Sequence, residues 1–209
     1  MSAIKVKICG IRDGEMALVA TEAGADFIGL VFVPSTPRQV SVEQAAQIVG
    51  ALGSDGPKAV GLFMDVPASE INDVTTRAGL DYVQLTGNEP PKLVAQLNRR
   101  VIKTVRCGGQ SHIDELLAEV EIWHEAGATV LLDAPGIAGG HGKLADWDYA
   151  TTIALRYPVI LAGGLSPANV GEAIERVQPW AVDVSSGVER ERGVKDAALI
   201  RAFIAAAKA

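Results

Sequence analysis

Two turns in the last third of the chain have the composition of an anion-binding site. Residues 162–165 (AGGL) follow one apolar run, and residues 183–187 (DVSSG) close the next. Turns of this kind that lead into helix N-termini present unpaired backbone N–H groups, which can bind a phosphate without a lysine. A single Gly-Gly pair would be better explained as a tight turn. Two successive turns of the same character favour phosphate binding.

Asp133 is a candidate acid–base residue. It ends an apolar run and precedes residues 136–142 (GIAGGHG), in which four of seven positions are glycine. An aspartate beside a glycine-rich loop suits a general acid or base beneath a closing lid. A carboxylate that caps the next helix, or one that pairs with Lys143, would fit the same pattern, and the sequence leaves these alternatives open.

Cys9 is a candidate base, because it ends the first apolar run and precedes Gly10. A buried thiol is most often an inert small apolar group. At the reactive end of a strand it could act as a base if its pKa were lowered, and nearby N–H dipoles could lower it. We expect the other cysteine, Cys107, to be structural or incidental.

Arg38 is a candidate ligand for a carboxylate. It ends a loop, residues 34–38 (PSTPR), whose freedom is limited by two prolines. A planar guanidinium aimed in this way can bind a carboxylate through two parallel hydrogen bonds. The alternative is a solvated surface arginine. The three histidines share no ligand spacing, so we expect no metal site.

The apolar pattern indicates the elements that carry these residues. Three similar phrases predict helices that end at Gly24, Gly79 and Gly127 and lead directly into strands. Eight short runs rich in Val, Ile and Leu predict strands of a parallel sheet that is covered on both faces. These runs are residues 4–9, 26–32, 58–63, 81–85, 101–105, 129–133, 158–162 and 180–184.

Helical spacing and capping residues occur between the predicted strands. Apolar residues recur three, four and seven positions apart, as on the buried face of a helix. These stripes are Leu116, Val120 and Trp123; Val170, Ala173, Ile174 and Val177; and Leu199, Ile200, Phe203 and Ile204. The predicted helix starts are Ser41 with Gln44, Ser111 with Asp114, and Ser166 with Pro167.

Eight strand–helix units without a composition break predict one domain, residues 1–209, folded as an α/β (β/α)8 TIM barrel. A doubly wound open sheet is the main rival, but it usually has fewer units for this length. The active site of such a barrel lies at the C-terminal ends of the strands. All of the candidates above fall there, and so does Gln84.

The composition and net charge of the chain limit the kinds of molecule that it is expected to bind. The chain has 209 residues, 48% of them hydrophobic, and a net charge of −6. A negative surface gives nucleic acid or an anionic membrane no long-range attraction, although a small anionic substrate is still possible. No apolar run approaches the ~18 residues of a membrane span, and the N-terminus lacks the pattern of a signal peptide. We therefore expect a soluble, cytoplasmic protein whose two cysteines are free thiols.

These features together resemble one family along nearly the whole chain, the phosphoribosylanthranilate isomerases of tryptophan biosynthesis. The order of the motifs along the chain is as informative as their amino-acid sequences. The motifs are KICGI (7–11), FVPSTPR (32–38), VGLF (60–63), VQLTG (83–87), LDA (132–134), GGHG (139–142), DW (146–147), LAGGLSPANV (161–170), DVSSGVE (183–189) and GVKD (193–196).

The resemblance implies an Amadori rearrangement of N-(5-phosphoribosyl)anthranilate to 1-(2-carboxyphenylamino)-1-deoxyribulose 5-phosphate, without a metal or other cofactor. The residue matching Asp133 would be the general acid that opens the sugar ring. The residue matching Cys9 would be the base that removes the C2 proton. The arginine matching Arg38 would hold the anthranilate carboxylate. We expect a monomer or homodimer with a phosphorylated small-molecule substrate. The expected substrate-binding residues are Arg38, Gln84, Gly163, Gly164, Asp183, Ser185, Ser186 and Gly187.

The chain departs from the family pattern at three positions beside the expected site. Thr86 stands where the family usually has histidine, His141 where it has threonine, and Ala145 near a usual aromatic. These changes could alter affinity or loop closure and leave the acid–base pair intact. The alternatives are another phosphosugar aldose–ketose isomerase barrel, whose aspartate or metal site Cys9 does not match, and a phosphate-binding barrel without catalysis.

Overall fold

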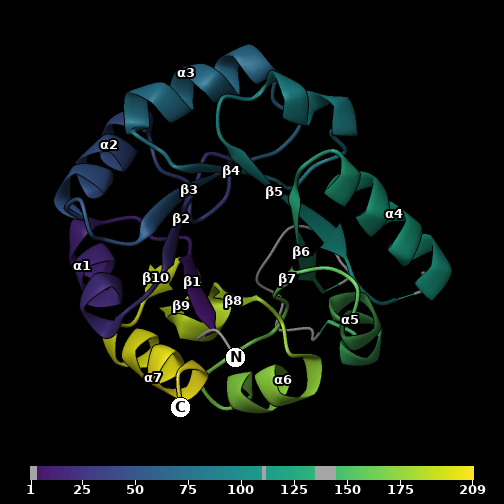
Figure 1. The fold of residues 1–209 in the computed structure, drawn as a ribbon. Coiled ribbons are helices and arrows are strands. Elements are labelled where there is room, and N and C mark those ends of the chain that lie inside the picture. Colours follow the sequence, from purple (N-terminus) through teal and green to yellow (C-terminus); the bar gives the residue numbers. More distant parts are fainter. Residues whose placement is uncertain (1–3, 110–111, 135–144) are drawn as a thin grey trace.

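The computed structural model describes residues 4–109, 112–134 and 145–209. Eight parallel strands close into a barrel, and Figure 1 shows the helices as an outer ring around them. Each observed strand lies within one residue of its predicted bounds at both ends. The strands are β1 (Lys5–Cys9), β2 (Phe27–Val31), β3 (Lys58–Phe63), β4 (Tyr82–Leu85), β5 (Arg100–Arg106), β6 (Thr129–Asp133), β7 (Val159–Leu161) and β8 (Ala181–Val184). The predicted TIM barrel is confirmed.

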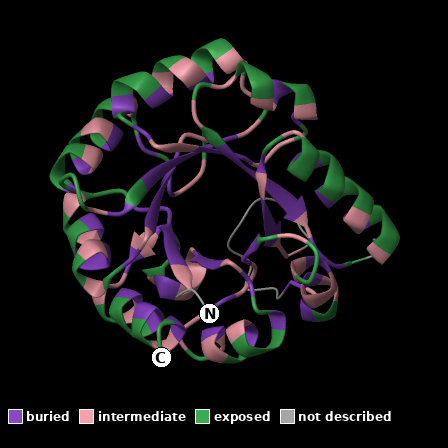
Figure 2. Cartoon of the chain, in the orientation of Figure 1, coloured by how far each residue is buried: buried purple, intermediate pink, exposed green. Residues whose placement is uncertain are grey.

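The helices cover the outside of the barrel and bury the apolar faces that the sequence predicts. Val170, Ala173 and Val177 of α6 are buried, as are Leu116, Val120 and Trp123 of α4. Figure 2 shows the same division on each helix, with buried residues toward the strands and exposed residues outside. The helices are α1 (Gly14–Ala23), α2 (Val42–Ala51), α3 (Ala68–Ala78), α4 (Ile113–Glu125), α5 (Trp147–Ala154), α6 (Val170–Val177) and α7 (Ala197–Ala207).

Two units depart from a simple strand–helix repeat. A short 3₁₀ helix, η1 (Pro91–Gln96), stands in the fourth unit in place of the expected α-helix, and Pro91 occupies its first position. After β8, a single 3₁₀ turn, η2 (Ser186–Val188), leads into a two-stranded hairpin, β9 (Glu189–Glu191) and β10 (Val194–Lys195). This hairpin lies at the end of the barrel beside β1 and β8 (Figure 1).

The helix ends test the predicted capping residues. Ser41 and Gln44 form the expected reciprocal capping box, and Gly24, Gly79 and Gly127 take the left-handed conformation with φ of 92°, 69° and 89°. The prediction for Ser166 was wrong. Its backbone opens a turn, and α6 begins only at Val170 with Asn169 in the N-cap position.

The start of α4 differs as well. The helix begins at Ile113, with His112 in the N-cap position and no side-chain capping bond. Ser111 lies outside the described residues. No helix in the described part of the chain has the length and apolar character needed to cross a membrane.

Closure of the barrel determines which turns become neighbours. β1 pairs with β8 as well as with β2, and Ile8 is in register with Val184. Cys9, at the end of the first strand, is therefore placed beside the turn that follows the last one. Because the strands follow sequence order around the sheet, closure of the barrel is what makes neighbours of the first and last strands.

Candidate active site

A cavity opens at the C-terminal ends of the barrel strands, where the site of a (β/α)8 barrel is expected. The structure brings nine of the ten predicted site residues to its wall. They are Cys9, Arg38, Gln84, Asp133, Gly163, Gly164, Asp183, Ser185 and Ser186. Gly187 is the exception and does not line the cavity.

Gly187 instead packs the two glycine turns together. A Cβ at this position would lie 1.9 Å from the carbonyl oxygen of Leu165, so no side chain fits between the turns. Within the described residues, the N–H groups of Gly164 and Ser186 donate no hydrogen bond and are available to a ligand. The turns after β7 and β8 thus form one surface of free backbone donors, as an anion site requires.

Cys9 lies next to a buried ion pair. Lys7, two residues earlier on β1, points into the barrel on the same side, and its Nζ donates to Asp183 Oδ1 at 2.8 Å. Gly29 on β2 leaves room for both groups, because a Cβ there would lie 2.8 Å from Cys9 Sγ and 3.2 Å from Lys7 Nζ. The thiol is therefore held close to an ammonium group in the interior.

The groups around the Cys9 thiol shift its pKa in opposite directions. Burial raises the pKa of Cys9, and Lys7 is the strongest influence that lowers it, with Lys195 adding a smaller one. The pKa of Lys7 is itself raised, because Asp183 and Cys9 outweigh the effect of burial. The groups that favour a thiolate are thus two ammonium groups and not the N–H dipoles expected from the sequence. Without ligand, burial outweighs them.

Asp133 ends β6 directly opposite Arg106, the last residue of β5. Arg106 Nη1 donates to Oδ2 of the carboxylate, and the N–H of Ala134 donates to Oδ1 at 2.8 Å. Burial nevertheless raises the pKa of Asp133, although Arg106 opposes the rise. A carboxyl group with a raised pKa at the cavity wall is suited to deliver a proton.

The alternatives for Asp133 are resolved in part. The N-cap of α5 is Asp146, which accepts from the N–H groups of Asp148 and Tyr149, so Asp133 does not cap that helix. Lys143 and the glycine-rich residues 136–142 lie outside the described residues. The cation that the structure pairs with Asp133 is Arg106.

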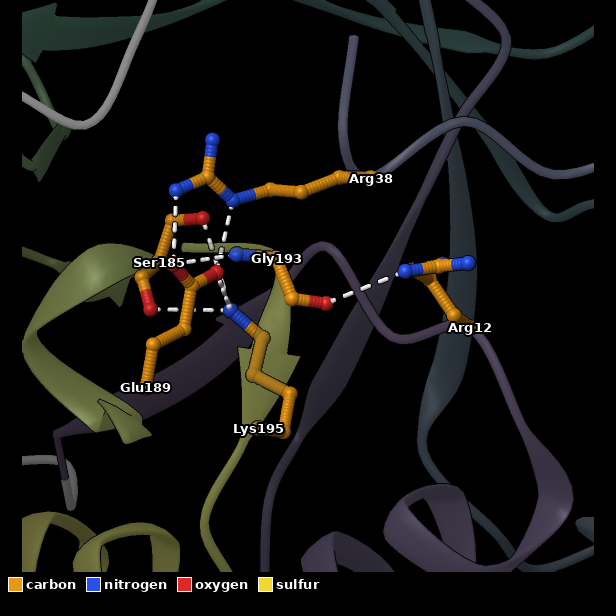
Figure 3. A network of polar contacts seen from close by, with 6 residues as sticks. All are labelled: Arg12, Arg38, Ser185, Glu189, Gly193 and Lys195. Atoms are coloured by element: carbon orange, nitrogen blue, oxygen red, sulfur yellow. Dashed lines mark hydrogen bonds and ion pairs between the residues drawn. The ribbon is translucent and has the colours of Figure 1, made fainter. Parts of the chain in front are cut away.

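Arg38 lines the cavity but is not free (Figure 3). Its Nε and Nη2 donate to the two carboxylate oxygens of Glu189 at 2.6 and 2.8 Å. The side chain is buried, so the alternative of a solvated arginine is wrong. Arg38 does make a bidentate contact with a carboxylate, but that carboxylate belongs to Glu189, and the expected contact with a substrate carboxylate stays a prediction.

Gln84 and Thr86 complete the wall between Arg38 and Asp133. Gln84 is buried and donates to Thr104 Oγ1 at 3.1 Å, while its Oε1 has no partner among the described residues. Thr86, one of the departures from the family pattern, donates to the Phe63 carbonyl at 2.9 Å. Gln84 therefore offers an acceptor to a ligand. His141 lies outside the described residues.

The second cysteine has a different environment. Cys107 is a free, buried thiol away from the cavity wall, and its Sγ donates to the carbonyl of Asp146 at 3.5 Å. Burial raises its pKa to about 12. Because it lies away from the cavity wall, this thiol has no substrate to act on, which agrees with the expectation that Cys107 is structural or incidental.

Sequence reasoning assigns no role to four charged residues that the structure places at or near the site: Lys7, Arg106, Glu189 and Lys195. Lys7 left one signal, a charge two positions before Cys9 in an otherwise apolar strand. Glu189 ends the motif of residues 183–189, but nothing in the sequence links it to its partner Arg38, which is 151 positions away. Only closure of the barrel makes such a pair visible.

Comparisons with known proteins agree over the whole chain. The family model of N-(5'-phosphoribosyl)anthranilate isomerase matches residues 6–206. The isomerase of Geobacter sulfurreducens is 49% identical over 207 residues, which cover 98% of each chain. The Thermotoga maritima structure has a TM-score of 0.88 at 39% identity and covers 98% of both chains.

A second solved isomerase structure carries a ligand. It holds reduced 1-(o-carboxyphenylamino)-1-deoxyribulose 5-phosphate and is similar to this chain at a TM-score of 0.85, with 37% identity and 98% of each chain covered. The match of the family model, the relatives close to half identical and the shared barrel lead to one conclusion. This chain belongs to the N-(5'-phosphoribosyl)anthranilate isomerase family.

Proposed function

We propose that this chain converts N-(5'-phosphoribosyl)anthranilate into 1-(2-carboxyphenylamino)-1-deoxyribulose 5-phosphate, an isomerisation in tryptophan biosynthesis. One observation carries the proposal beyond family membership. A thiol on β1 and a carboxyl group on β6 line the same cavity, which also contains two turns whose Gly164 and Ser186 N–H groups have no acceptor among the described residues. The reaction needs an acid, a base and a phosphate site, and these residues supply all three.

Asp133 acts first, as the general acid. Its proton goes to the ring oxygen of the ribose, the bond from that oxygen to C1 breaks, and the nitrogen lone pair completes a C=N bond. Burial raises the pKa of Asp133, which keeps a proton available at higher pH than an exposed aspartate could.

Cys9 acts second, as the general base. Its thiolate removes the proton from C2, and the electron pair of that C–H bond moves into the imine to give an enolamine. Protonation at C1 and loss of the hydroxyl proton at O2 then give the ketone. Lys7 and Lys195 stabilise the thiolate, because both are cations close to a sulfur that is otherwise buried.

The two charged ends of the substrate bind apart from the reacting carbons. The phosphate accepts hydrogen bonds from the N–H groups of Gly164 and Ser186, and the anthranilate carboxylate accepts a hydrogen bond from Arg38. Gln84 Oε1, which has no partner among the described residues, accepts a hydrogen bond from a substrate hydroxyl group. These contacts hold C1 and C2 between the acid and the base.

The assay that tests this function follows the loss of substrate fluorescence on addition of the purified chain. We expect turnover that saturates with substrate and needs no added metal or cofactor. Turnover of a phosphosugar that lacks the anthranilate group, with none of the proposed substrate, would favour another isomerase of the same fold. Binding of phosphate without any turnover would indicate an inactive barrel.

Replacement of Arg38 by alanine is expected to weaken substrate binding. Hydrogen bonds to charged groups contribute ~1.5–3 kcal/mol, so KM should rise by roughly tenfold or more while kcat changes less. Steady-state kinetics of the variant measure both parameters. An unchanged KM would remove Arg38 from the binding site. Arg38→Lys is the control, since it retains the charge but cannot form the bidentate contact with Glu189 that orients the side chain.

Replacement of Arg106 by leucine is expected to shift the pH dependence. Arg106 and Asp183 are the charged groups that most affect Asp133 in the described part of the chain, and Arg106 is the one that favours the carboxylate. Without it the pKa of Asp133 rises further, so the acid stays protonated to higher pH. The basic limb of the kcat/KM profile should therefore move to higher pH by about one pH unit. This is the low end of the pKa shift expected when a carboxyl group loses its ion pair, because solvent reaches the one-third exposed Arg106 side chain.

The measurement is kcat/KM against pH for wild type, Arg106→Leu and Arg106→Lys. The lysine variant keeps a positive charge and should leave the limb near its wild-type position. A basic limb at the same pH in all three proteins would mean that it does not report Asp133.

The proposed function also bears on where the protein works and on its oligomeric state. Isomerases of this pathway work on small soluble metabolites, so we infer a cytoplasmic enzyme. The Thermotoga maritima relative is described as dimeric, and monomers have been generated from it. A monomer or a homodimer is therefore our expectation for this chain.

A further inference from the structure

The β9–β10 hairpin, which follows β8, brings a carboxylate and an ammonium group together next to residues of the cavity wall. Glu189, the first residue of β9, is in antiparallel register with Lys195, the last residue of β10. The hairpin tip also packs on the loop that carries Arg38. A Cβ at Gly193 would lie 2.7 Å from the carbonyl oxygen of Pro37, so only glycine permits this approach.

Every acceptor position of Glu189 is occupied by the protein (Figure 3). Oε1 accepts from Arg38 Nε at 2.6 Å and from Lys195 Nζ at 2.9 Å. Oε2 accepts from Arg38 Nη2 at 2.8 Å and from the Gly193 N–H at 3.0 Å. The side chain is 3% exposed. Glu189 therefore has no capacity to bind substrate itself, and its effect must pass through the groups it holds.

Arg38 is restricted as a consequence. Its Nε edge is turned toward Glu189, and in Figure 3 the remaining terminal nitrogen points away from the carboxylate. Its aliphatic stem lies over Gly10, where a Cβ would be 2.6 Å from Arg38 Cδ. The guanidinium is thus held between Glu189 and the turn at Gly10, and it presents one nitrogen to a ligand.

The same carboxylate reaches the phosphate-binding turn through Lys195. The ammonium group that donates to Glu189 also donates to the carbonyl of Ser185 at 2.8 Å. One buried acid therefore connects the arginine on one side of the cavity with the turn after β8. Two basic side chains share this one acid, and burial lowers the pKa of Lys195 although Glu189 opposes that effect, so an incoming anion would favour the protonated form of Lys195.

We propose that Glu189 is a positioning residue that sets the spacing between Arg38 and the phosphate-binding turn, so that the site selects substrates with two anionic groups at that separation. The inference rests on the proposed function. It assigns the choice of substrate to a residue that touches neither the substrate nor the reacting atoms.

The experiment compares the binding of two probes to wild type and to Glu189→Gln. One probe is the reduced product analogue with a phosphate and an aryl carboxylate, and the other is inorganic phosphate alone. We expect the variant to bind the analogue at least tenfold more weakly and to bind inorganic phosphate within about threefold of wild type. An equal loss of both would mean that the residue is only structural, and no loss of either would overturn the proposal.

Two further variants keep the test decisive. Glu189→Asp retains the charge but is one methylene shorter, so it should show the same selective loss if the glutamine variant does not fold. Glu191→Gln removes an exposed charge from the same strand and should change neither affinity. Since binding is measured directly, a wild-type chain that fails to bind the analogue would contradict the proposed function and not the role of Glu189.

Discussion

Replacement of Cys9 by alanine is expected to reduce turnover by ~10²-fold or more, the range for loss of one general base. The methyl group of alanine cannot accept the C2 proton, and the carboxylate at that wall of the cavity, Asp183, is held in an ion pair with Lys7. The barrel should still fold, because alanine is smaller than cysteine and the site has no disulfide to lose. The measurement is the loss of substrate fluorescence with time.

The pH dependence of wild type gives a second measure of the same role. Burial raises the pKa of Cys9, so the thiolate fraction should increase as pH rises above the ordinary range of a cysteine. The rate of alkylation of Cys9 by iodoacetamide should rise over the same pH interval. A rate that falls as the thiol ionises would contradict a thiolate base.

Cys107→Ala is the matched control for Cys9→Ala. Both positions carry buried free thiols at strand ends, but Cys107 does not line the cavity. We expect the control variant to keep nearly full activity. Near wild-type turnover in Cys9→Ala, or an equal loss in both variants, would overturn the assignment of Cys9 as the base.

Replacement of Asp133 by asparagine is the second change with a large expected effect. The amide has nearly the same shape as the carboxyl group, and its one oxygen can still accept from either Arg106 or the Ala134 N–H, so the side chain should stay at the cavity wall. It has no proton to give to the ring oxygen, so turnover should fall by ~10²–10⁴-fold. Binding of the reduced product analogue should change much less, because the phosphate and carboxylate contacts remain.

Asp148→Asn provides the comparison for this variant. Asp148 is an exposed aspartate in the first turn of α5 that pairs with Arg176 outside the cavity. Its replacement should leave turnover unchanged. If Asp133→Asn retained near wild-type turnover, ring opening would not depend on this carboxyl group. If it lost analogue binding as strongly as turnover, the residue would be a binding group and not the acid.

The sequence alone was sufficient for the barrel and for most of the cavity wall. Strand bounds followed from short Val/Ile/Leu runs, because a strand covered on both faces has to be apolar along its length. Gly24, Gly79 and the Ser41 capping box were predictable because these features depend on residues only a few positions apart. Cys9 and Asp133 were placed on one rim by the rule that parallel barrel strands end at the same face.

Tertiary structure decided what each of these residues touches. Lys7 and Asp183 are 176 positions apart, and Arg38 and Glu189 are 151 apart, so no local pattern could pair them. The same holds for the pKa of Cys9, since its direction depends on how far burial outweighs two lysines from different strands. Charge pairing and desolvation are properties of the closed barrel, because both depend on distances that chain closure creates.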